Sequence, residues 1–275
     1  MSKKFKVACV QNCATADLES SIAQCIELSR DAASAGADLI CLPEYFSCLY
    51  MDQSGFSLGG HAQDQHPALS AFKLLADELG VWMLLGSMAI EAGSEQIYNR
   101  SFLIDDHGQL AAHYDKVHLF DVDLANGESY RESDTIVPGD KAVVATTPWG
   151  GLGLTVCYDL RFAALYRSLA QAGASFLAVP AAFTRTTGQA HWHVLLRSRA
   201  IETGCYVFAP CQYGQHGSAE SYGHSLIIDP WGVVIADAGD GPGFALAEVD
   251  PELVLHSRSM IPALEHDRPF TVTDS

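Results

Sequence analysis

The sequence of 275 residues lacks an apolar run that approaches the roughly 20 residues needed to cross a membrane as a helix. Its first residues, Met1-Ser2-Lys3-Lys4-Phe5, show neither the apolar region nor the cleavage site of a signal peptide. The eight cysteines are scattered and no two form a CxxC pair, so we expect reduced thiols rather than a disulfide framework. Together these absences predict a cytoplasmic protein without membrane partners.

Basic residues are also scarce. The chain has 16 Lys and Arg against 33 Asp and Glu, which gives a formal net charge of −17, and no Lys/Arg cluster is present. An acidic protein repels polyanions, so nucleic acid and anionic membranes are excluded as expected partners. The same charge repels an anionic small molecule at long range, and such a substrate would need local arginines.

What the sequence does contain is the pattern of an α/β protein. Apolar residues are 48% of the chain, and short apolar runs alternate with segments of helical periodicity. Helices are predicted at 18–35, 67–79, 163–172 and 190–203. Strands are predicted at 4–11, 39–42, 81–90, 97–104, 109–115, 141–146, 151–156, 175–180, 205–211, 223–228, 233–238 and 243–249. The similar content of the two halves suits two sheets packed face to face with helices outside.

The segment 151–162 combines a buried strand with reactive residues. It begins as a short apolar run, turns polar at Cys157 and continues into the helical pattern at 163–172. A strand-to-helix turn lifts a side chain out of the sheet and directs backbone N–H groups toward an anion, which suits a thiolate nucleophile. The alternative is an inert core cysteine, but the charged residues that follow favour the nucleophile.

Two further reactive residues follow predicted strands. Glu44 comes after the strand 39–42, where a carboxylate is costly unless it is paired or used, and Lys116 follows the strand 109–115. Each also has an ordinary interpretation as a solvent-facing residue at a strand end. Because strand ends at one sheet edge converge and bind ligands in α/β proteins, the three residues together predict one site.

The motifs around these residues resemble a known family. Three of them, in order, resemble the signatures of the nitrilase superfamily of carbon–nitrogen hydrolases: Leu42-Pro43-Glu44-Tyr45, Tyr114-Asp115-Lys116-Val117-His118-Leu119-Phe120-Asp121 and Val156-Cys157-Tyr158-Asp159-Leu160-Arg161-Phe162. Segments 188–192, 199–202, 222–225 and 229–232 resemble its Nit branch, and the similarity extends from about residue 6 to 270.

The resemblance implies a fold and an assembly. The expected fold is a four-layer αββα sandwich of α/β class, with two mixed sheets packed face to face and helices outside. It implies one domain over residues 1–275, whose tail from about 251–275 packs on the body or on a second subunit of a homodimer. No cofactor and no metal are expected. His191 and His193, two residues apart on a predicted helix, face different ways and are poor joint ligands.

The resemblance also implies a catalytic set of Glu44, Lys116 and Cys157 with Glu132 as a second glutamate; Glu128 is the lower-ranked candidate for that position. Glu44 would act as the base, and Lys116 with the Tyr158 backbone N–H would stabilise the oxyanion of an attacked amide. Further candidates for binding substrate are Tyr45, Arg131, Arg161, Phe183, Thr184, Arg185 and His191. Each arginine has the alternative role of a structural ion pair.

The implied reaction is hydrolysis of a small, carboxylate-bearing amide through a cysteine thioester. The expected substrate is deaminated glutathione, which would give 2-oxoglutarate and cysteinylglycine. The alternative is an ω-amidase activity on 2-oxoglutaramate, which would form the same oxoglutaryl thioester. Another aliphatic amidase, a nitrile-cleaving enzyme and a non-catalytic binding protein on the same fold are less favoured.

Overall fold

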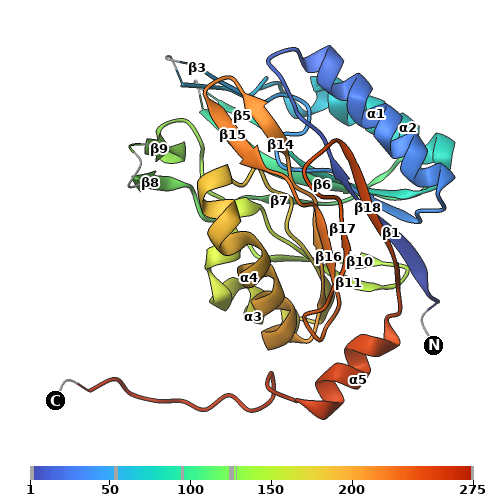
Figure 1. The fold of residues 1–275 in the computed structure, drawn as a ribbon, viewed down its shortest axis with the longest axis vertical. Helices are drawn as coiled ribbons and strands as arrows, with labels where there is room; N and C mark the ends of the chain where they lie inside the picture. Colours follow the sequence, from blue (N-terminus) through green and yellow to red (C-terminus); the bar gives the residue numbers. More distant parts are fainter. Residues whose placement is uncertain (1–2, 53–54, 94–95, 124–126, 128, 274–275) are drawn as a thin grey trace.

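Two six-stranded sheets pack face to face between two pairs of helices in the computed structural model (Figure 1). The structure describes residues 3–52, 55–93, 96–123, 127 and 129–273. The first sheet has the order β18 (Gly243–Val249), β1 (Phe5–Gln11), β2 (Leu39–Cys41), β5 (Trp82–Gly93), β6 (Gln96–Ile104) and β7 (Leu110–Asp115). The second has the order β10 (Val143–Thr147), β11 (Gly150–Leu154), β12 (Ala174–Ala178), β13 (Tyr206–Ala209), β16 (Leu226–Ile228) and β17 (Val234–Asp237).

Both sheets are mixed, as the sequence predicts. Strands β1, β2 and β5 run parallel, and their flanking partners β18, β6 and β7 join antiparallel. The second sheet repeats this plan, with β11, β12 and β13 parallel and the outer strands antiparallel. The parallel strands are therefore central in each sheet, where both faces are covered.

The alternation of side chains along these strands builds the layers. In β1, Val7 and Cys9 face the core between the sheets, whereas Ala8 and Val10 face the helices outside. In β12, Phe176 faces the same central core. Strands with two buried faces give the near-continuous apolar runs seen in the sequence.

Helices α1 (Leu18–Ser34) and α2 (Pro67–Leu79) cover the first sheet, and α3 (Ala163–Gln171) and α4 (Arg185–Thr203) cover the second (Figure 1). Helix α4 begins five residues before the predicted start at 190. The sequence did not predict this first turn, because it contains Gly188 and glycine disfavours helices. A Cβ at Gly188 would lie 2.4 Å from the Tyr222 side chain, so close packing requires glycine here.

Two connections that lie outside the predicted helices and strands contain hairpins. The segment 122–140 contributes to the hairpin of β8 (Asp121–Asp123) and β9 (Ser129–Arg131), followed by a 3₁₀ turn at Glu132–Asp134. The segment 212–221 forms β14 (Tyr213–His216) and β15 (Ala219–Tyr222). A smaller hairpin joins β3 (Tyr50–Asp52) to β4 (Gly55–Ser57). The candidate Glu128 lies outside the described residues.

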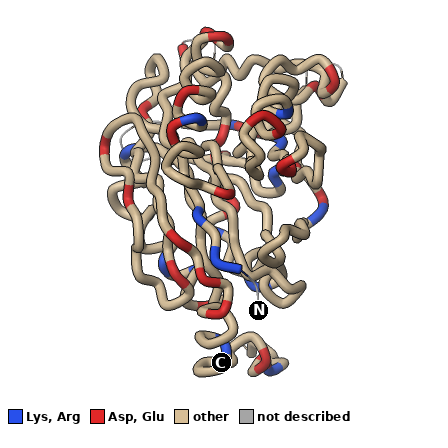
Figure 2. The backbone as a smooth tube through the Cα atoms, turned by 90° about the vertical axis from the view of Figure 1, so that its right-hand side faces the viewer, with Lys and Arg blue, Asp and Glu red and all other residues tan. Residues whose placement is uncertain are grey.

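Helix α5 (Glu252–Met260) leads into a tail that extends beside the body (Figure 1). Arg167 of α3 binds the tail through the Ala263 carbonyl, at 2.9 Å, and through the Asp267 carboxylate. Acidic and basic residues are dispersed along the backbone rather than gathered on one element (Figure 2). None of the helices in the described part of the chain is long and apolar enough to span a membrane.

Candidate active site

Three loops that follow strands converge on one cavity. Glu44 follows β2 of the first sheet, and Cys157 opens a 3₁₀ turn, Cys157–Arg161, that follows β11 of the second sheet. The structure brings Glu44, Lys116 and Cys157 to one cavity, but they come from two sheets and not from the single sheet edge that we predicted. Face-to-face packing places the ends of strands from both sheets side by side.

Lys116 follows a predicted strand, as expected. This strand, β7, lies at the edge of the first sheet, and three of its six residues are exposed. The Lys116 backbone N–H donates to the Asn99 carbonyl at 3.0 Å and so continues the pairing with β6. This pairing directs the lysine into the interior, where 1% of its side chain is exposed.

Lys116 lies between two carboxylates. Its Nζ donates to Glu44 Oε1 at 3.0 Å and to Glu132 Oε1 and Oε2 at 2.9 and 2.8 Å. Burial opposes a charged lysine, yet the charges of Glu132 and Glu44 outweigh burial and hold the pKa of Lys116 well above its ordinary value. Burial raises the pKa of Glu132, and the Lys116 charge counters this rise. The ammonium is therefore a fixed positive charge.

Cys157 sits beside this cluster in a constrained backbone conformation. Its φ is +48°, in the left-handed region that side chains disfavour, and its N–H donates to the Pro180 carbonyl at 2.9 Å. Burial raises the pKa of the Cys157 thiol well above its ordinary value, and the charge of Glu44 raises it further. Cys157 and Glu44 line the same cavity. The resting group is consequently a thiol near a carboxylate, which suits removal of its proton by Glu44.

Buried polar groups hold Glu44 in place. Its Oε1 also accepts from Asn99 Nδ2, and its Oε2 accepts from the Ala182 N–H, each at 2.8 Å. Gln212 Nε2 donates to the Glu44 carbonyl at 3.1 Å. A Cβ at Gly86 would lie 2.0 Å from the Leu42 carbonyl oxygen, so only glycine allows the chain to pass beneath this loop. A carboxylate with several fixed donors keeps one orientation.

Asp159 connects the loop of Lys116 with the turn of Cys157. Its Oδ2 accepts from Tyr114 Oη at 2.7 Å and from the Val156 N–H at 2.8 Å. Its Oδ1 accepts from the His118 N–H at 3.1 Å and lies 2.7 Å from His118 Nδ1. Sequence reasoning missed this role, although Asp159 lies within the quoted motif. Asn99 and Gln212 were missed too, because nothing in their local sequence marks them as partners of Glu44.

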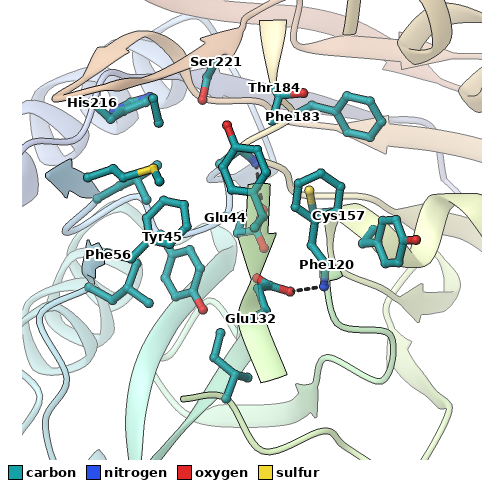
Figure 3. Close-up of a pocket in the computed structure, with 18 of the residues that line it drawn as sticks. Glu44, Tyr45, Phe56, Phe120, Glu132, Cys157, Phe183, Thr184, His216 and Ser221 are labelled. Atoms are coloured by element: carbon teal, nitrogen blue, oxygen red, sulfur yellow. Dashed lines mark hydrogen bonds between the residues drawn. The ribbon is translucent and has the colours of Figure 1, made fainter. Parts of the chain in front are cut away.

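The cluster lines a cavity of about 360 Å³. Figure 3 shows Glu44, Glu132 and Cys157 together, with His216 and Ser221 across the cavity from Glu132. Within the described part of the chain, neither Tyr45 Oη nor His216 Nε2 has a hydrogen-bond partner, and both atoms are buried. Both residues line the cavity. His216 was not singled out from the sequence.

The remaining predicted substrate-binding residues fall into two groups. Tyr45, Arg131, Tyr158, Arg161, Phe183 and Thr184 line the cavity. Arg185 lines an adjoining polar recess instead and pairs with Glu220 at 3.1 Å. His191 is exposed, lies outside the residues that line the cavity, and contacts Arg161 with Nδ1 3.3 Å from Nη1. Arg131 is paired with Asp123 at 2.7 Å, in line with its alternative structural role.

Comparison with known proteins matches this architecture to one family. The carbon–nitrogen hydrolase family matches the chain over residues 6–258. The chain belongs to the carbon–nitrogen hydrolase family. Membership confirms the resemblance found in the sequence, and a carbon–nitrogen hydrolase acts on carbon–nitrogen bonds other than peptide bonds.

Similar proteins include two named deaminated glutathione amidases. The one from Synechocystis sp. is 41% identical over 270 residues, which cover 96% of this chain and 98% of that protein. The one from Homo sapiens is 41% identical over 275 residues, covering 96% of this chain and 82% of that protein.

Solved structures agree with the fold. The NitFhit protein of C. elegans has a TM-score of 0.87 at 31% identity; the match covers 97% of this chain and 66% of that one. Nit3 of Saccharomyces cerevisiae, described as a member of branch 10 of the nitrilase superfamily, has a TM-score of 0.83 at 29% identity and coverages of 95% and 96%. The predicted αββα sandwich of this carbon–nitrogen hydrolase is confirmed.

Proposed function

We propose that the protein is an amidase that uses Cys157 as its nucleophile. The observation that carries the proposal is the contact of one buried ammonium, Lys116, with two carboxylates in the cavity that Cys157 also lines. A nucleophile, a base and a fixed cation within one cavity are the groups that amide hydrolysis requires. A related amidase from Nesterenkonia sp. AN1 (25% identity, TM-score 0.77, coverages of 93% and 94%) shows, in a glutamate-to-leucine mutant, covalent addition of an acetamide moiety at its active-site cysteine.

In the proposed reaction Glu44 takes the thiol proton as Cys157 Sγ attacks the amide carbonyl. The tetrahedral oxyanion is stabilised by Lys116 Nζ and the Tyr158 backbone N–H. Glu44 then returns the proton to the leaving amine, which departs and leaves a thioester. Glu44 next deprotonates a water, which attacks the thioester; the acid is released, and the departing Cys157 thiolate takes the proton back from Glu44. Glu132 keeps Lys116 charged and oriented throughout.

For the substrate we propose deaminated glutathione, an amide with carboxylates at both ends. The relatives named for this substrate support it. A polar recess next to the main cavity also supports a two-part substrate. It shares Tyr130 and Glu220 with the main cavity and is further lined by Arg185, Gln189 and Gln215, among others. The cavity would hold the oxoglutaryl part and the recess the cysteinylglycine part.

The alternative, 2-oxoglutaramate, would leave the recess empty because its leaving group is ammonia. The deciding test is kcat/KM of the purified protein on both amides, with Cys157→Ala as the blank. The proposal expects a preference for deaminated glutathione of more than about tenfold, or roughly 1.4 kcal/mol of transition-state binding. The opposite preference would establish the ω-amidase activity instead.

We also propose that the protein forms the homodimer that the resemblance implies. Val194 and Ile201, which are 64% and 56% exposed, lie seven residues apart and so share one face of α4. Trp231, 50% exposed, belongs to the turn whose Gly232 contacts Ile201. An exposed apolar face of this kind supports burial against a second subunit. Light scattering coupled to size-exclusion chromatography is expected to give twice the mass of the chain, and a monomer mass would contradict it.

A further inference from the structure

A second cluster of reactive side chains lies outside the cavity. His193 of α4, His224 from the turn between β15 and β16, and Asp237 at the end of β17 each direct one ligand atom to a common point. These three atoms all lie within 4.8 Å of one another. His224 Nδ1 is 3.0 Å from Asp237 Oδ1, and His193 Nε2 is 3.5 Å from Asp237 Oδ2. The residues come from three separate elements, so chain connectivity alone does not explain their meeting.

The spacing fits a tetrahedral metal ion. Zinc–nitrogen and zinc–oxygen bonds of about 2.0–2.2 Å place neighbouring ligand atoms of a tetrahedron roughly 3.3–3.6 Å apart. The separations of 3.0 and 3.5 Å between the histidine nitrogens and Asp237 lie close to this range, and all three ligand atoms lie within 4.8 Å, so small side-chain rotations would complete the site. Two imidazoles and a carboxylate form a donor set that suits zinc and its neighbours, rather than magnesium or calcium.

A fourth residue supplies the outer support that metal-binding histidines need. His224 Nε2 lies 3.1 Å from an oxygen of Asp240, on the side of the ring away from Nδ1. A histidine that binds a metal through one nitrogen usually donates its other N–H to a carboxylate, which fixes the ring and its tautomer. With Nε2 of His224 held by Asp240, Nδ1 of the same ring can bind an ion. The ion would replace the proton between Nδ1 and the Asp237 carboxylate.

The backbone holds His224 in an unusual position. Its φ is +54°, a conformation that costs free energy in residues other than glycine. Its carbonyl accepts from Trp192 Nε1 at 2.8 Å, and its ring stacks on Tyr222 with centroids 4.7 Å apart. The ring is thus oriented before any ion arrives. The three ligand side chains are 22–34% exposed, so an ion can reach them from solvent.

We propose that His193, His224 and Asp237 bind one divalent transition-metal ion of the zinc type, with water as the fourth ligand. The ion would fasten α4 to the turn that follows β15. Because Ser221 of β15 lines the main cavity, the ion would stabilise the wall of that cavity without touching the reacting atoms. The proposal does not depend on which amide is the substrate.

The test is isothermal titration calorimetry of the protein with Zn²⁺ as the only added metal ion. Cys157→Ala serves as the parent, so that the cavity thiol cannot bind the ion, and reductant that binds zinc is omitted. We expect one ion per chain. His193→Ala and Asp237→Asn are each expected to weaken binding by more than about 100-fold, and Asp240→Asn by about tenfold. His191→Ala is the matched control, since it removes an exposed imidazole from the same helix and is expected to leave the affinity unchanged.

Two further measurements test whether the variants are folded and whether one of the other cysteines binds the ion. Zn²⁺ is expected to raise the Tm of the parent and of His191→Ala, but not that of His193→Ala. Co²⁺ in the same protein is expected to lack the thiolate charge-transfer absorption that a cysteine site would give. The proposal is overturned if the parent binds no ion, if His193→Ala binds as tightly as His191→Ala, or if the bound Co²⁺ shows thiolate absorption.

Discussion

Tyr114 donates a hydrogen bond of 2.7 Å to Asp159, and this bond joins the strand that leads to Lys116 to the turn that carries Cys157. Asp159 is fully buried and also accepts from the Val156 N–H and from His118. A single carboxylate therefore connects the segments, one from each sheet, that carry the proposed catalytic residues Lys116 and Cys157.

Substitution of Asp159 should therefore disturb both stability and turnover. An amide in Asp159→Asn accepts through one oxygen only, and a buried donor left without a partner costs about 1–3 kcal/mol. We expect a lower Tm and a lower kcat, with KM less affected because Asp159 does not line the cavity. Tyr114→Phe removes the bond to Asp159 and the one that Tyr114 Oη accepts from the Val117 N–H at 3.2 Å, and it is expected to cost about 1–3 kcal/mol of unfolding free energy while Asp159 keeps its other partners. An Asp159→Asn variant with the same kcat as the parent would contradict the view that Asp159 positions Lys116 and Cys157.

Substitutions of the proposed catalytic residues are expected to lower kcat to different extents. Cys157→Ala is expected to fold normally and to have no turnover, because no nucleophile remains. Lys116→Ala should lower kcat by about 100- to 1,000-fold, the usual effect of losing an oxyanion donor. Glu44→Gln should lower it by about 100- to 10,000-fold, the usual range for a general base.

Steady-state kinetics with circular dichroism as the folding check would measure these effects. Cys13→Ala is the matched control, because Cys13 is a partly buried thiol that does not line the cavity. Turnover by folded Cys157→Ala, or an unchanged kcat in Lys116→Ala, would contradict the assignment.

Glu44, Lys116 and Cys157 could be found from the sequence because each stands where a strand pattern stops. Glu44 and Cys157 end apolar runs, Lys116 follows a predicted strand, and the surrounding motifs added Glu132 by resemblance. How these residues come together in space could not be predicted from the sequence. Two sheets contribute the site, and the partners Asn99 and Gln212 reach Glu44 only through pairings between distant segments, which no local pattern records.

The polar recess leads to a prediction about specificity. Arg185 is half exposed and lies in the recess, not in the cavity that holds the cluster. If it binds the carboxylate of cysteinylglycine, Arg185→Gln should lower kcat/KM on deaminated glutathione by about tenfold or more, since hydrogen bonds to charged groups contribute about 1.5–3 kcal/mol. The same variant should keep its kcat/KM on 2-oxoglutaramate, which lacks that group. Equal losses on both amides would mean that Arg185 acts on folding or on the acyl part.

His66 makes the stability of the fold depend on pH. It is fully buried, and its Nδ1 accepts from the Ala68 N–H at 3.2 Å, at the N-terminus of α2. Burial, aided by the charge of His61, lowers the pKa of His66 from 6.5 to about 4. Between these pH values His66 is protonated in the unfolded chain but not in the folded chain. The free energy of unfolding therefore keeps its full contribution from His66 above pH 6.5 and loses it as the pH falls toward about 4.

The expected loss from His66 over this window is of the order of 3 kcal/mol. Urea unfolding of the parent and of His66→Asn, at neutral pH and near the lower pKa, would measure it. Asparagine can still accept the bond at the helix start but does not titrate. The variant should therefore lose less stability on acidification than the parent. An equal loss in both proteins would show that His66 does not control this dependence.

The central claim is that one thioester forms on Cys157, and acid-quenched mass spectrometry during turnover tests it most directly. Deaminated glutathione and 2-oxoglutaramate share their acyl part and differ only in the group that leaves. The account predicts the same oxoglutaryl adduct from both amides, on the peptide that contains Cys157, and no adduct in Cys157→Ala. Turnover without an adduct under conditions that trap thioesters, or an adduct on a different residue, would contradict the account.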